Sequence, residues 1–166
     1  MFSLQKDIFK RINHTDDITI RGLIFAAMFN PNFKAMLMIE KMRRTKNTTM
    51  KLLRSLKIQK YCGCVITSTA TIGENLLLPH PLGVVIGASA VVGKDCTIFQ
   101  QVTLGQKDGK YPVIGNNVTI YPGAKIFGDI KIGDNVIIGA NSVVNTDIPD
   151  NAVAAGIAAR VLRTRG

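Results

Sequence analysis

A repeat of six residues runs through most of this chain and constrains its fold more than any other feature. With two interruptions, an aliphatic residue occupies every sixth position, at Ile66, Ile72, Leu78, Ile86, Val92, Ile98, Leu104, Ile114, Ile120, Ile126, Ile132, Ile138 and Val144. In all but one unit a second small or aliphatic residue follows four positions later, at Ala70, Leu76, Leu82, Ala90, Cys96, Val102, Val118, Ala124, Ile130, Val136, Ser142 and Ile148. This period fits neither an α-helix nor the simple alternation of a half-buried strand. It indicates a solenoid, whose units bury their apolar residues by stacking on one another.

Glycine directly follows the aliphatic residue in seven of the thirteen units, at Gly73, Gly87, Gly93, Gly105, Gly115, Gly133 and Gly139. Such placement suits sharp turns between very short strands, where a positive φ angle or a close approach of two backbones is needed. Three such strands would close one triangular coil, with the aliphatic side chains stacked inside from coil to coil. We therefore expect a mainly β fold with a parallel β-helix as its body.

The first 61 residues lack this period and are predicted to form short helices. Asn30 followed by Pro31 predicts a helix start, with asparagine as the N-cap and proline in the first turn. A second helix is predicted from about Thr48 to Lys60. One face of this helix carries leucines that we expect to pack on a neighbouring domain or subunit, Leu52, Leu53 and Leu56.

The basic charge of the chain is concentrated in this N-terminal segment. Residues 1–64 hold 13 Lys/Arg against 4 Asp/Glu, a net charge of +9, whereas residues 65–166 hold 8 against 7, a net charge of +1. Basic segments contact anionic membranes, acidic polymers or nucleic acid, or simply form a solvated helical face. We retain a peripheral contact with a membrane or with an acidic saccharide, and expect no nucleic-acid partner.

Composition narrows the class of protein further. Apolar residues make up 46% of the chain and charged residues 19%, as in a globular protein, and no apolar run approaches the roughly 18 residues of a membrane span. The first residues lack the apolar core of a signal peptide. Cys62, Cys64 and Cys96 form no disulfide framework, and with two distant histidines they make no zinc site. We expect a cytoplasmic protein with free thiols and no metal. Its basic segment would allow it to lie at the inner face of the membrane.

The repeat region resembles the hexapeptide-repeat acyltransferases, and within them the serine acetyltransferase-like branch. The blocks that carry the resemblance are HPLGVVIG at 80–87, IFQQVTLG at 98–105, the run at 111–133, IGANSVV at 138–144 and AGIAARV at 155–161. The resemblance implies a left-handed parallel β-helix, acetyl-CoA as co-substrate and a homotrimer with its sites between subunits. We divide the chain into a basic α-helical segment at 1–61, a β-helix catalytic domain at 62–152 and a C-terminal tail at 153–166.

Two interruptions break the period, and irregularities of a solenoid are where function usually collects. Leu78 and Ile86 are eight residues apart, around His80, and Leu104 and Ile114 are ten apart, which predicts a loop at 106–113. We expect the two interruptions to lie within reach of one another. Three units to a turn would also place the residue at position 100 beside position 80 on the next coil.

His80, the only histidine of the repeat region, is the candidate general base. An alcohol is a weak nucleophile at neutral pH, and an imidazole with a pKa near 6.5 can remove its proton and return it to a leaving thiolate. Gln100 is the candidate to orient the substrate or His80. The resemblance implies a ternary complex without a covalent enzyme intermediate, and a structural histidine that caps a turn is the alternative.

The resemblance also implies where acetyl-CoA would bind. Gly105, Gly123 and Ala140 match small residues beside the pantetheine arm, although tight turns would explain the glycines equally well. Arg160 and Arg163 are candidates for contacts with the CoA phosphates, because a guanidinium pairs with phosphate through two hydrogen bonds. A solvated C-terminus is the alternative for these arginines.

Acceptor recognition is where the chain departs from serine acetyltransferases. Those enzymes carry an aspartate immediately before the catalytic histidine and another fifteen residues upstream, where this chain has Pro79 and Val65. Burying an ammonium group without a carboxylate is costly, which disfavours a free amino acid. We therefore expect the acceptor to be a sugar hydroxyl of a capsular, exo- or lipopolysaccharide or its precursor, as in the related polysaccharide O-acetyltransferases. Lys107, Lys110 and Tyr111 of the loop would bind this acceptor.

Two other functions stay open. The first is a serine O-acetyltransferase of cysteine biosynthesis, with the same chemistry at the same histidine. The second is a non-catalytic β-helix that binds or scaffolds other molecules, which the histidine and the loop beside it disfavour.

Overall fold

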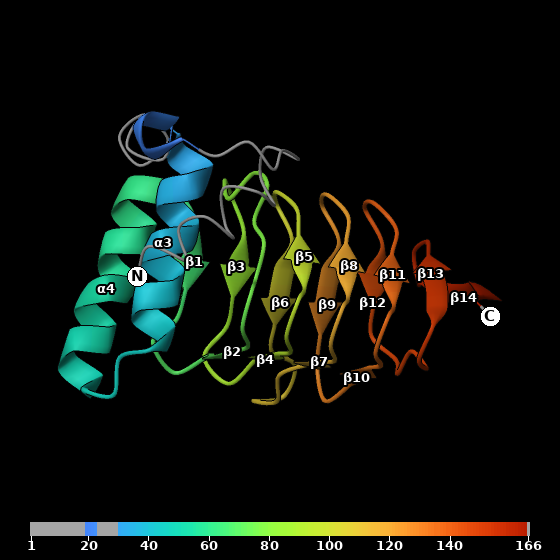
Figure 1. Cartoon of the computed structure of the whole chain (residues 1–166). Helices are drawn as coiled ribbons and strands as arrows, with labels where there is room; N and C mark the ends of the chain where they lie inside the picture. Colours follow the sequence, from blue (N-terminus) through green and yellow to red (C-terminus); the bar gives the residue numbers. More distant parts are fainter. Residues whose placement is uncertain (1–18, 23–29, 166) are drawn as a thin grey trace.

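The computed structural model describes residues 19–22 and 30–165, and shows a β-solenoid with two helices against one end (Figure 1). Residues 1–18 and 23–29, which include the earlier part of the predicted basic segment, lie outside the described residues. The two helices are α3 (Pro31–Arg43) and α4 (Thr48–Cys62). The strands are β1 (Val65–Ile66), β2 (Thr71–Ile72), β3 (Val85–Ile86), β4 (Val91–Val92), β5 (Thr97–Ile98), β6 (Thr103–Gly105), β7 (Val113–Ile114), β8 (Thr119–Ile120), β9 (Lys125–Phe127), β10 (Lys131–Ile132), β11 (Ile137–Ile138), β12 (Val143–Val144), β13 (Ala152–Ala155) and β14 (Arg160–Thr164).

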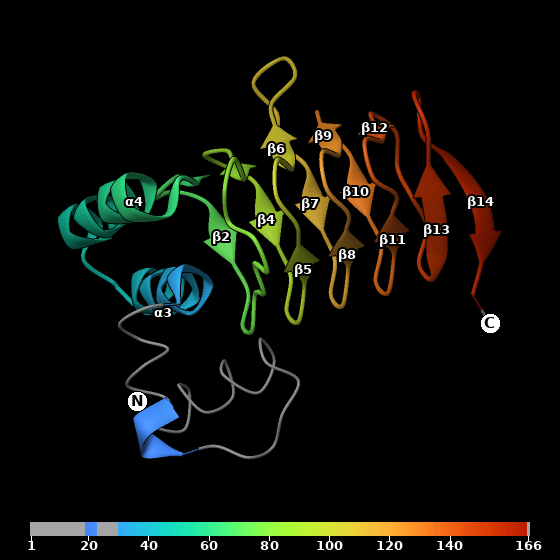
Figure 2. The ribbon, with the colours of Figure 1, turned by 90° about the horizontal axis from the view of Figure 1, so that it is seen from above.

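The strands form three sheets, and successive strands along the chain enter different sheets. The first sheet has the order β1-β3-β6-β9-β12, the second β2-β4-β7-β10, and the third β5-β8-β11-β13-β14. All pairings between these strands are parallel except that of β13 with β14, which is antiparallel. Seen from above, the strands stand in rows between the helices at one end and the β13–β14 pair at the other (Figure 2). The predicted β fold of stacked three-stranded coils is confirmed.

The core is the column of side chains inside the coils. Every aliphatic residue of the six-residue repeat is buried. The second set is also buried inside the coil, apart from the half-buried Ile130 and from Leu82, which is 68% exposed. The prediction for Leu82 was wrong, because the chain is two residues longer at this point and Val84 takes the inward place.

The corners show why glycine follows the strands of the second sheet. A Cβ atom on Gly93 would lie 2.4 Å from the carbonyl oxygen of Gly115 on the next coil, so close approach of two backbones requires glycine there. Positive φ angles belong instead to asparagines and aspartates two residues later, such as Asn117 (53°) and Asn135 (58°). The Asn117 amide donates to the Asn135 amide oxygen (2.9 Å), in a ladder that runs from coil to coil. Short polar side chains tolerate this left-handed conformation best after glycine.

Both predicted helices are confirmed, including their starts. The Asn30 side chain accepts hydrogen bonds from two backbone N–H groups of the first turn of α3, and the Asn47 side chain caps α4 in the same way. Ile58 and Cys62 lie on the inner face of α4 and are buried in the core of the solenoid. The three leucines of the opposite face do not pack on the solenoid of the same chain, because they are about half exposed: Leu52 48%, Leu53 47% and Leu56 52%. Their packing on a neighbouring subunit stays a prediction. No helix within 19–22 or 30–165 is long and apolar enough to span a bilayer.

Candidate active site

His80 lies at the corner that joins the third sheet to the first, which we call the His80 corner. Leu77 forms a parallel bridge with Thr97 of the next coil, so three residues further on His80 is level with Gln100. The sequence predicted this alignment. Neighbouring strands of a sheet lie about 4.8 Å apart, which sets the scale of the separation between the two backbones.

Two extra residues make the His80 corner wider than the corner of the next coil. Before the corner the Ile98 N–H donates to the Leu77 carbonyl oxygen, and after it the Gln101 N–H donates to the Leu82 carbonyl oxygen (3.1 Å). The pairing between the two coils is therefore displaced by two residues across the corner. The extra length falls in the run Pro79-His80-Pro81, where Pro81 is buried and His80 is exposed. His80 lies in a bend and is exposed to solvent, and the prolines restrict its backbone, because proline fixes its own φ angle and disfavours helical backbone in the preceding residue.

The side chains at this corner have hydrogen-bonding capacity that the chain itself leaves unused. Gln100 Oε1 is buried and has no hydrogen-bond partner among the described residues. Such an atom is rare, since buried side-chain oxygens normally accept a hydrogen bond. Within the same part of the chain the His80 imidazole also makes no hydrogen bond or ion pair. A polar ligand bound at the corner could use both groups.

An aromatic pair stands beside the His80 corner and was missed by the sequence analysis. The rings of Phe99 and Tyr121 are stacked, with centroids 5.3 Å apart and planes at 9°. Each residue directly follows an inward aliphatic residue of the third sheet, as Pro79 does on the coil before. Tyr121 is 41% exposed, so the stack offers an aromatic face to a ligand or to another chain. The sequence signal for this pair was the presence of aromatic residues at equivalent positions of successive coils.

The second interruption is a β-hairpin, at what we call the hairpin corner between the first and second sheets. Lys107 and Lys110 each donate their backbone N–H to the other's carbonyl oxygen (3.0 Å). Asp108 and Gly109 between them have φ angles of 53° and 78°, as a type I′ turn requires. The sequence analysis predicted only a loop here, although the Asp-Gly pair was a signal for a hairpin.

The loop side chains divide between a cavity and the core. Lys110 forms an ion pair with Asp129, and a cavity of about 330 Å³ is lined by Lys107, Asp108, Lys110, Phe127, Gly128, Asp129, Ile130 and Asn145. Tyr111 instead packs on the core: a Cβ atom on Gly87 would lie 2.2 Å from its ring atom Cε1. The two lysines thus face a cavity that could take a ligand, whereas Tyr111 packs against the solenoid.

The expectation that the two interruptions lie within reach of one another is wrong for a single chain. The His80 corner precedes strand β3 of the first sheet, and the hairpin follows strand β6 of the same sheet. They therefore lie at opposite ends of that sheet: in Figure 1 the loops after β5, β8 and β11 lie along the upper side, and the hairpin projects on the lower side. Because each coil contains three units, corners that join the same two sheets stack on one another along the solenoid. The His80 corner and the hairpin corner join different sheets, so they lie on different faces.

The residues predicted to bind acetyl-CoA fall on both corners. Gly123 and Ala140 stand on coils beyond Gln100 at the His80 corner, whereas Gly105 ends β6 beside the hairpin. Gly123 has a φ angle of 77°, and a Cβ atom there would lie 2.1 Å from the Asn141 amide oxygen, so the turn itself requires glycine. A Cβ atom on Gly105 would meet nothing closer than 3.6 Å, so the position would accept a small side chain in ordinary van der Waals contact.

The arginines of the tail extend the third sheet. Arg160 and Arg163 lie in β14, where they pair with Ala155 and Val153 of β13, and both are exposed. Their guanidinium groups are therefore accessible to an anionic ligand, as the prediction requires, but no contact with another described residue directs them towards either corner.

The cysteines are buried thiols. Burial raises the pKa of Cys64 to about 12, with the nearby Cys62 contributing, and burial also raises the pKa of Cys62. A thiol with so high a pKa stays protonated at neutral pH and is a poor nucleophile. In the described part of the chain no group of three His, Cys, Asp or Glu side chains is placed to hold a metal ion.

Comparison with known protein families gives a match within the solenoid. The family described as "Bacterial transferase hexapeptide (six repeats)" matches residues 111–146. A serine acetyltransferase of Synechococcus elongatus is 44% identical over 108 residues, which cover 63% of this chain and 44% of that protein. The chain spans about half the length of the curated relatives it matches.

Solved structures are similar over nearly the whole chain. Serine acetyltransferase of Neisseria gonorrhoeae in complex with serine superposes with a TM-score of 0.78 at 30% identity, covering 95% of this chain and 66% of that one. A serine acetyltransferase in complex with CoA superposes with a TM-score of 0.80 at 29% identity, covering 96% and 67%. The similarity therefore includes the two helices as well as the solenoid.

Proposed function

We propose that this protein transfers an acetyl group from acetyl-CoA to a hydroxyl group, with His80 as the general base. The observation that carries the proposal is the His80 corner. A single histidine is held there between two prolines, beside the buried and unpaired Oε1 of Gln100. The similarity to serine acetyltransferases, one of them solved with CoA, supports the same chemistry.

The reaction needs only proton transfer and positioning. The neutral imidazole of His80 accepts the proton of the acceptor hydroxyl while the hydroxyl oxygen attacks the thioester carbonyl. The tetrahedral intermediate then collapses, the C–S bond breaks, and the imidazolium returns the proton to the leaving thiolate. The exposed position of His80 allows both substrates to reach it.

Gln100 and the nearby backbone would supply the polar contacts of this reaction. Its buried Oε1 is an acceptor, suited to a hydrogen bond from the His80 ring N–H or from a donor on the substrate. The oxyanion of the intermediate would be held by backbone N–H groups or by an amide, as in other acyl transfers. Gln100 would thus act in positioning, and His80 in catalysis.

The separation of the two corners supports a site between copies of the chain. In a homotrimer, the His80 corner of one chain would face the hairpin corner of the next, which would bring His80 to Lys107, Lys110 and Gly105 across one groove. Acetyl-CoA would lie in this groove, with Gly105, Gly123 and Ala140 along the pantetheine arm. Arg160 and Arg163 of the tail would contact its phosphates.

Serine is the acceptor that the comparisons support best. The relatives and solved structures are serine acetyltransferases, and one of the structures is a complex with serine. They support this acceptor better than the saccharide expected from the sequence.

A saccharide hydroxyl remains a second candidate because of two features. Pro79 and Val65 stand where the serine enzymes carry aspartates, so the carboxylates expected to bind an ammonium group are missing from these positions. The stacked rings of Phe99 and Tyr121 beside the corner offer the kind of aromatic face on which sugar rings can lie.

The first test is the replacement of His80 in the intact protein. H80A should lower acetyl transfer by about 10²–10⁴-fold, since that is the usual contribution of a general base. H14A removes the only other histidine and is the matched control, with activity expected to equal that of the wild type. Comparable activity of H80A and H14A, at unchanged circular dichroism, would overturn the mechanism.

The acceptor is tested by measuring thiol release from acetyl-CoA with serine, nucleotide sugars and purified polysaccharides side by side. We expect turnover with serine to exceed turnover with the saccharides. Efficient acetylation of a saccharide, with serine inert, would move the assignment to the second candidate and leave the role of His80 intact.

A further inference from the structure

The outward face of α4 is an apolar surface without a partner among residues 19–22 and 30–165. Leu52, Leu53 and Leu56 are each about half exposed and fall within one arc of the helix, because residues three and four apart lie on the same side. The opposite face, with Ile58 and Cys62, is buried in the solenoid core. The leucines therefore lie on the side of α4 away from the solenoid core. The helix itself stands at one end of the solenoid (Figure 1).

Basic side chains surround this surface. The exposed Lys57 and Lys60 lie on the same side of α4 as the leucines. Residues 30–62 carry nine Lys/Arg and one Asp/Glu, a net charge of +8. The one acid, Glu40, is already paired with Arg43 of α3 (2.5 Å) and with the C-cap residue Arg44 (2.6 Å).

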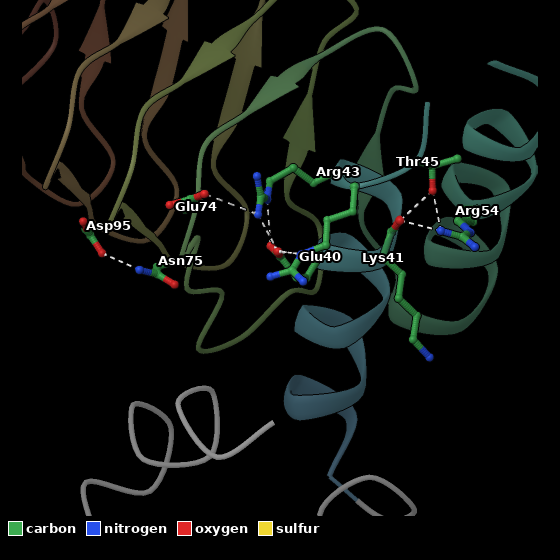
Figure 3. A network of polar contacts seen from close by, with 9 residues as sticks. Glu40, Lys41, Arg43, Thr45, Arg54, Glu74, Asn75 and Asp95 are labelled. Carbon is green, nitrogen blue, oxygen red and sulfur yellow. Dashed lines mark hydrogen bonds and ion pairs between the residues drawn. The ribbon is translucent and has the colours of Figure 1, made fainter. Parts of the chain in front are cut away.

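A cationic cavity lies between the two helices. It has a volume of about 230 Å³ and is lined by Met38, Lys41, Arg54 and Lys57. Figure 3 shows that Arg54 is held in place by the Lys41 carbonyl oxygen and the Thr45 hydroxyl oxygen. A guanidinium has five N–H donors, so a fixed Arg54 has donors left for the oxygens of an anion. Among the residues that the structure describes, no carboxylate lines the cavity.

A further exposed residue of α4 is aromatic. Tyr61 is 60% exposed near the end of α4, with the ammonium groups of Lys34 and Lys60 at 5.8 Å and 5.7 Å from its ring centroid. Tyrosine flanked by lysine is typical of the boundary between lipid and water, where an apolar ring and a polar tip are both accommodated.

We propose that this face of α4, together with the cationic cavity, docks the protein onto an anionic phospholipid bilayer. The leucines would enter the boundary between headgroups and acyl chains, and the cavity would take a lipid phosphate. The combination of a basic surround with a row of apolar side chains is what an interfacial helix requires. The fifteen residues of α4 would lie in the membrane plane.

A second copy of the chain fits this surface less well. Packing the same faces together would bring two segments of net charge +8 into contact, and like charges in an interface are costly. A purely acidic polymer would satisfy the lysines but would leave the leucines in water. A bilayer satisfies both.

The test measures co-sedimentation of the full chain with vesicles. Vesicles of phosphatidylcholine alone are compared with vesicles that contain 30% phosphatidylglycerol, at about 0.1 M salt. We expect binding to the anionic vesicles only. The pair K57E/K60E should weaken binding more than about twentyfold, since each lysine near an anionic surface is worth about fivefold. The pair K94E/K131E changes the net charge equally on the exposed solenoid and is the matched control, expected to weaken binding far less.

A second variant tests the apolar part of the surface. L52S/L56S keeps the charge and should weaken vesicle binding about tenfold or more while leaving thermal stability nearly unchanged, because both side chains are exposed. The proposal is overturned if the wild type ignores anionic vesicles, or if the solenoid pair weakens binding as much as the helix pair. Leucine-independent binding would mean a purely electrostatic partner, and a change of assembly size in L52S/L56S without vesicle binding would mean a second copy. H80A should bind vesicles normally, so this result stands apart from the test of acetyl transfer.

Discussion

At the scale of single residues, the glycines of the solenoid have two different roles. Gly93 sits against the backbone of the next coil, with no room for a side chain. Gly105 has the same place in its six-residue unit but has ordinary van der Waals space around its missing Cβ atom. The same sequence pattern thus includes one glycine that packing requires and another, beside the hairpin corner, where a Cβ atom would fit in ordinary contact.

This difference predicts that two alanine substitutions affect different properties, stability at Gly93 and acetyl-CoA binding at Gly105. G93A should lower the free energy of unfolding by about 1–3 kcal/mol, the usual cost of overpacking. G105A should change it by less than about 0.5 kcal/mol, but should raise KM for acetyl-CoA if the pantetheine arm passes there. Urea denaturation and steady-state kinetics measure the two effects, and an unchanged KM in G105A would remove this residue from the proposed groove.

At the scale of elements, α3 and α4 are joined to the solenoid by a polar network as well as by apolar packing. Glu40 accepts hydrogen bonds from Arg43 and Arg44, and Arg43 also reaches Glu74 at the first coil (3.8 Å, Figure 3). The hydrogen bonds from Arg43 lower the pKa of Glu40, with those from Arg44 adding to them, against desolvation by burial, which raises it. The carboxylate is thus held charged where the helices meet the solenoid.

The lowered pKa of Glu40 predicts a pH-dependent contribution to stability. A carboxyl group whose pKa is lowered by folding stabilises the protein above its unfolded pKa, and this contribution is lost as the pH falls through the folded pKa. E40Q should therefore lower Tm at pH 7, and the difference from the wild type should shrink at acidic pH. Thermal melts of both proteins at pH 7 and in the acid range measure it, and a pH-independent difference would show that the ion pairs do not stabilise the protein.

At the scale of the whole molecule, stability comes from stacking. Strands of two or three residues have no stability of their own, and they are held by parallel strands of neighbouring coils. The inward residues of each sheet form a continuous column, in which Ile98, Ile120 and Ile138 are completely buried. Loss of one inward side chain therefore weakens the contacts of two coils.

Truncation of a central member of this column tests the point. I120A should lower the free energy of unfolding by about 2–5 kcal/mol, as is usual for large-to-small substitutions in a core. K131A changes an exposed residue of β10, in the second sheet, and should cost less than about 0.5 kcal/mol. Denaturant unfolding of both variants measures the difference. Equal stabilities would mean that the inward column is not the source of the stability.

The sequence by itself determined the coil and its register. The period of six specified which residues turn inward, and the count of three units to a turn placed Gln100 level with His80, because each coil repeats the geometry of the last. The caps of both helices were equally local, since asparagine caps a helix through its own side chain. These features depend on residues near in sequence or related by the period.

Only the tertiary structure decided what the irregularities do. The two interruptions were expected together, but they lie at opposite ends of one sheet, because the position of a corner depends on which sheet the chain has just left. Leu82 turned outward because two extra residues shifted the inward place to Val84, and the leucines of α4 stayed exposed because the solenoid end was already filled by its other face. Burial at such points depends on the sum of all contacts around a residue, which a pattern along the chain does not contain.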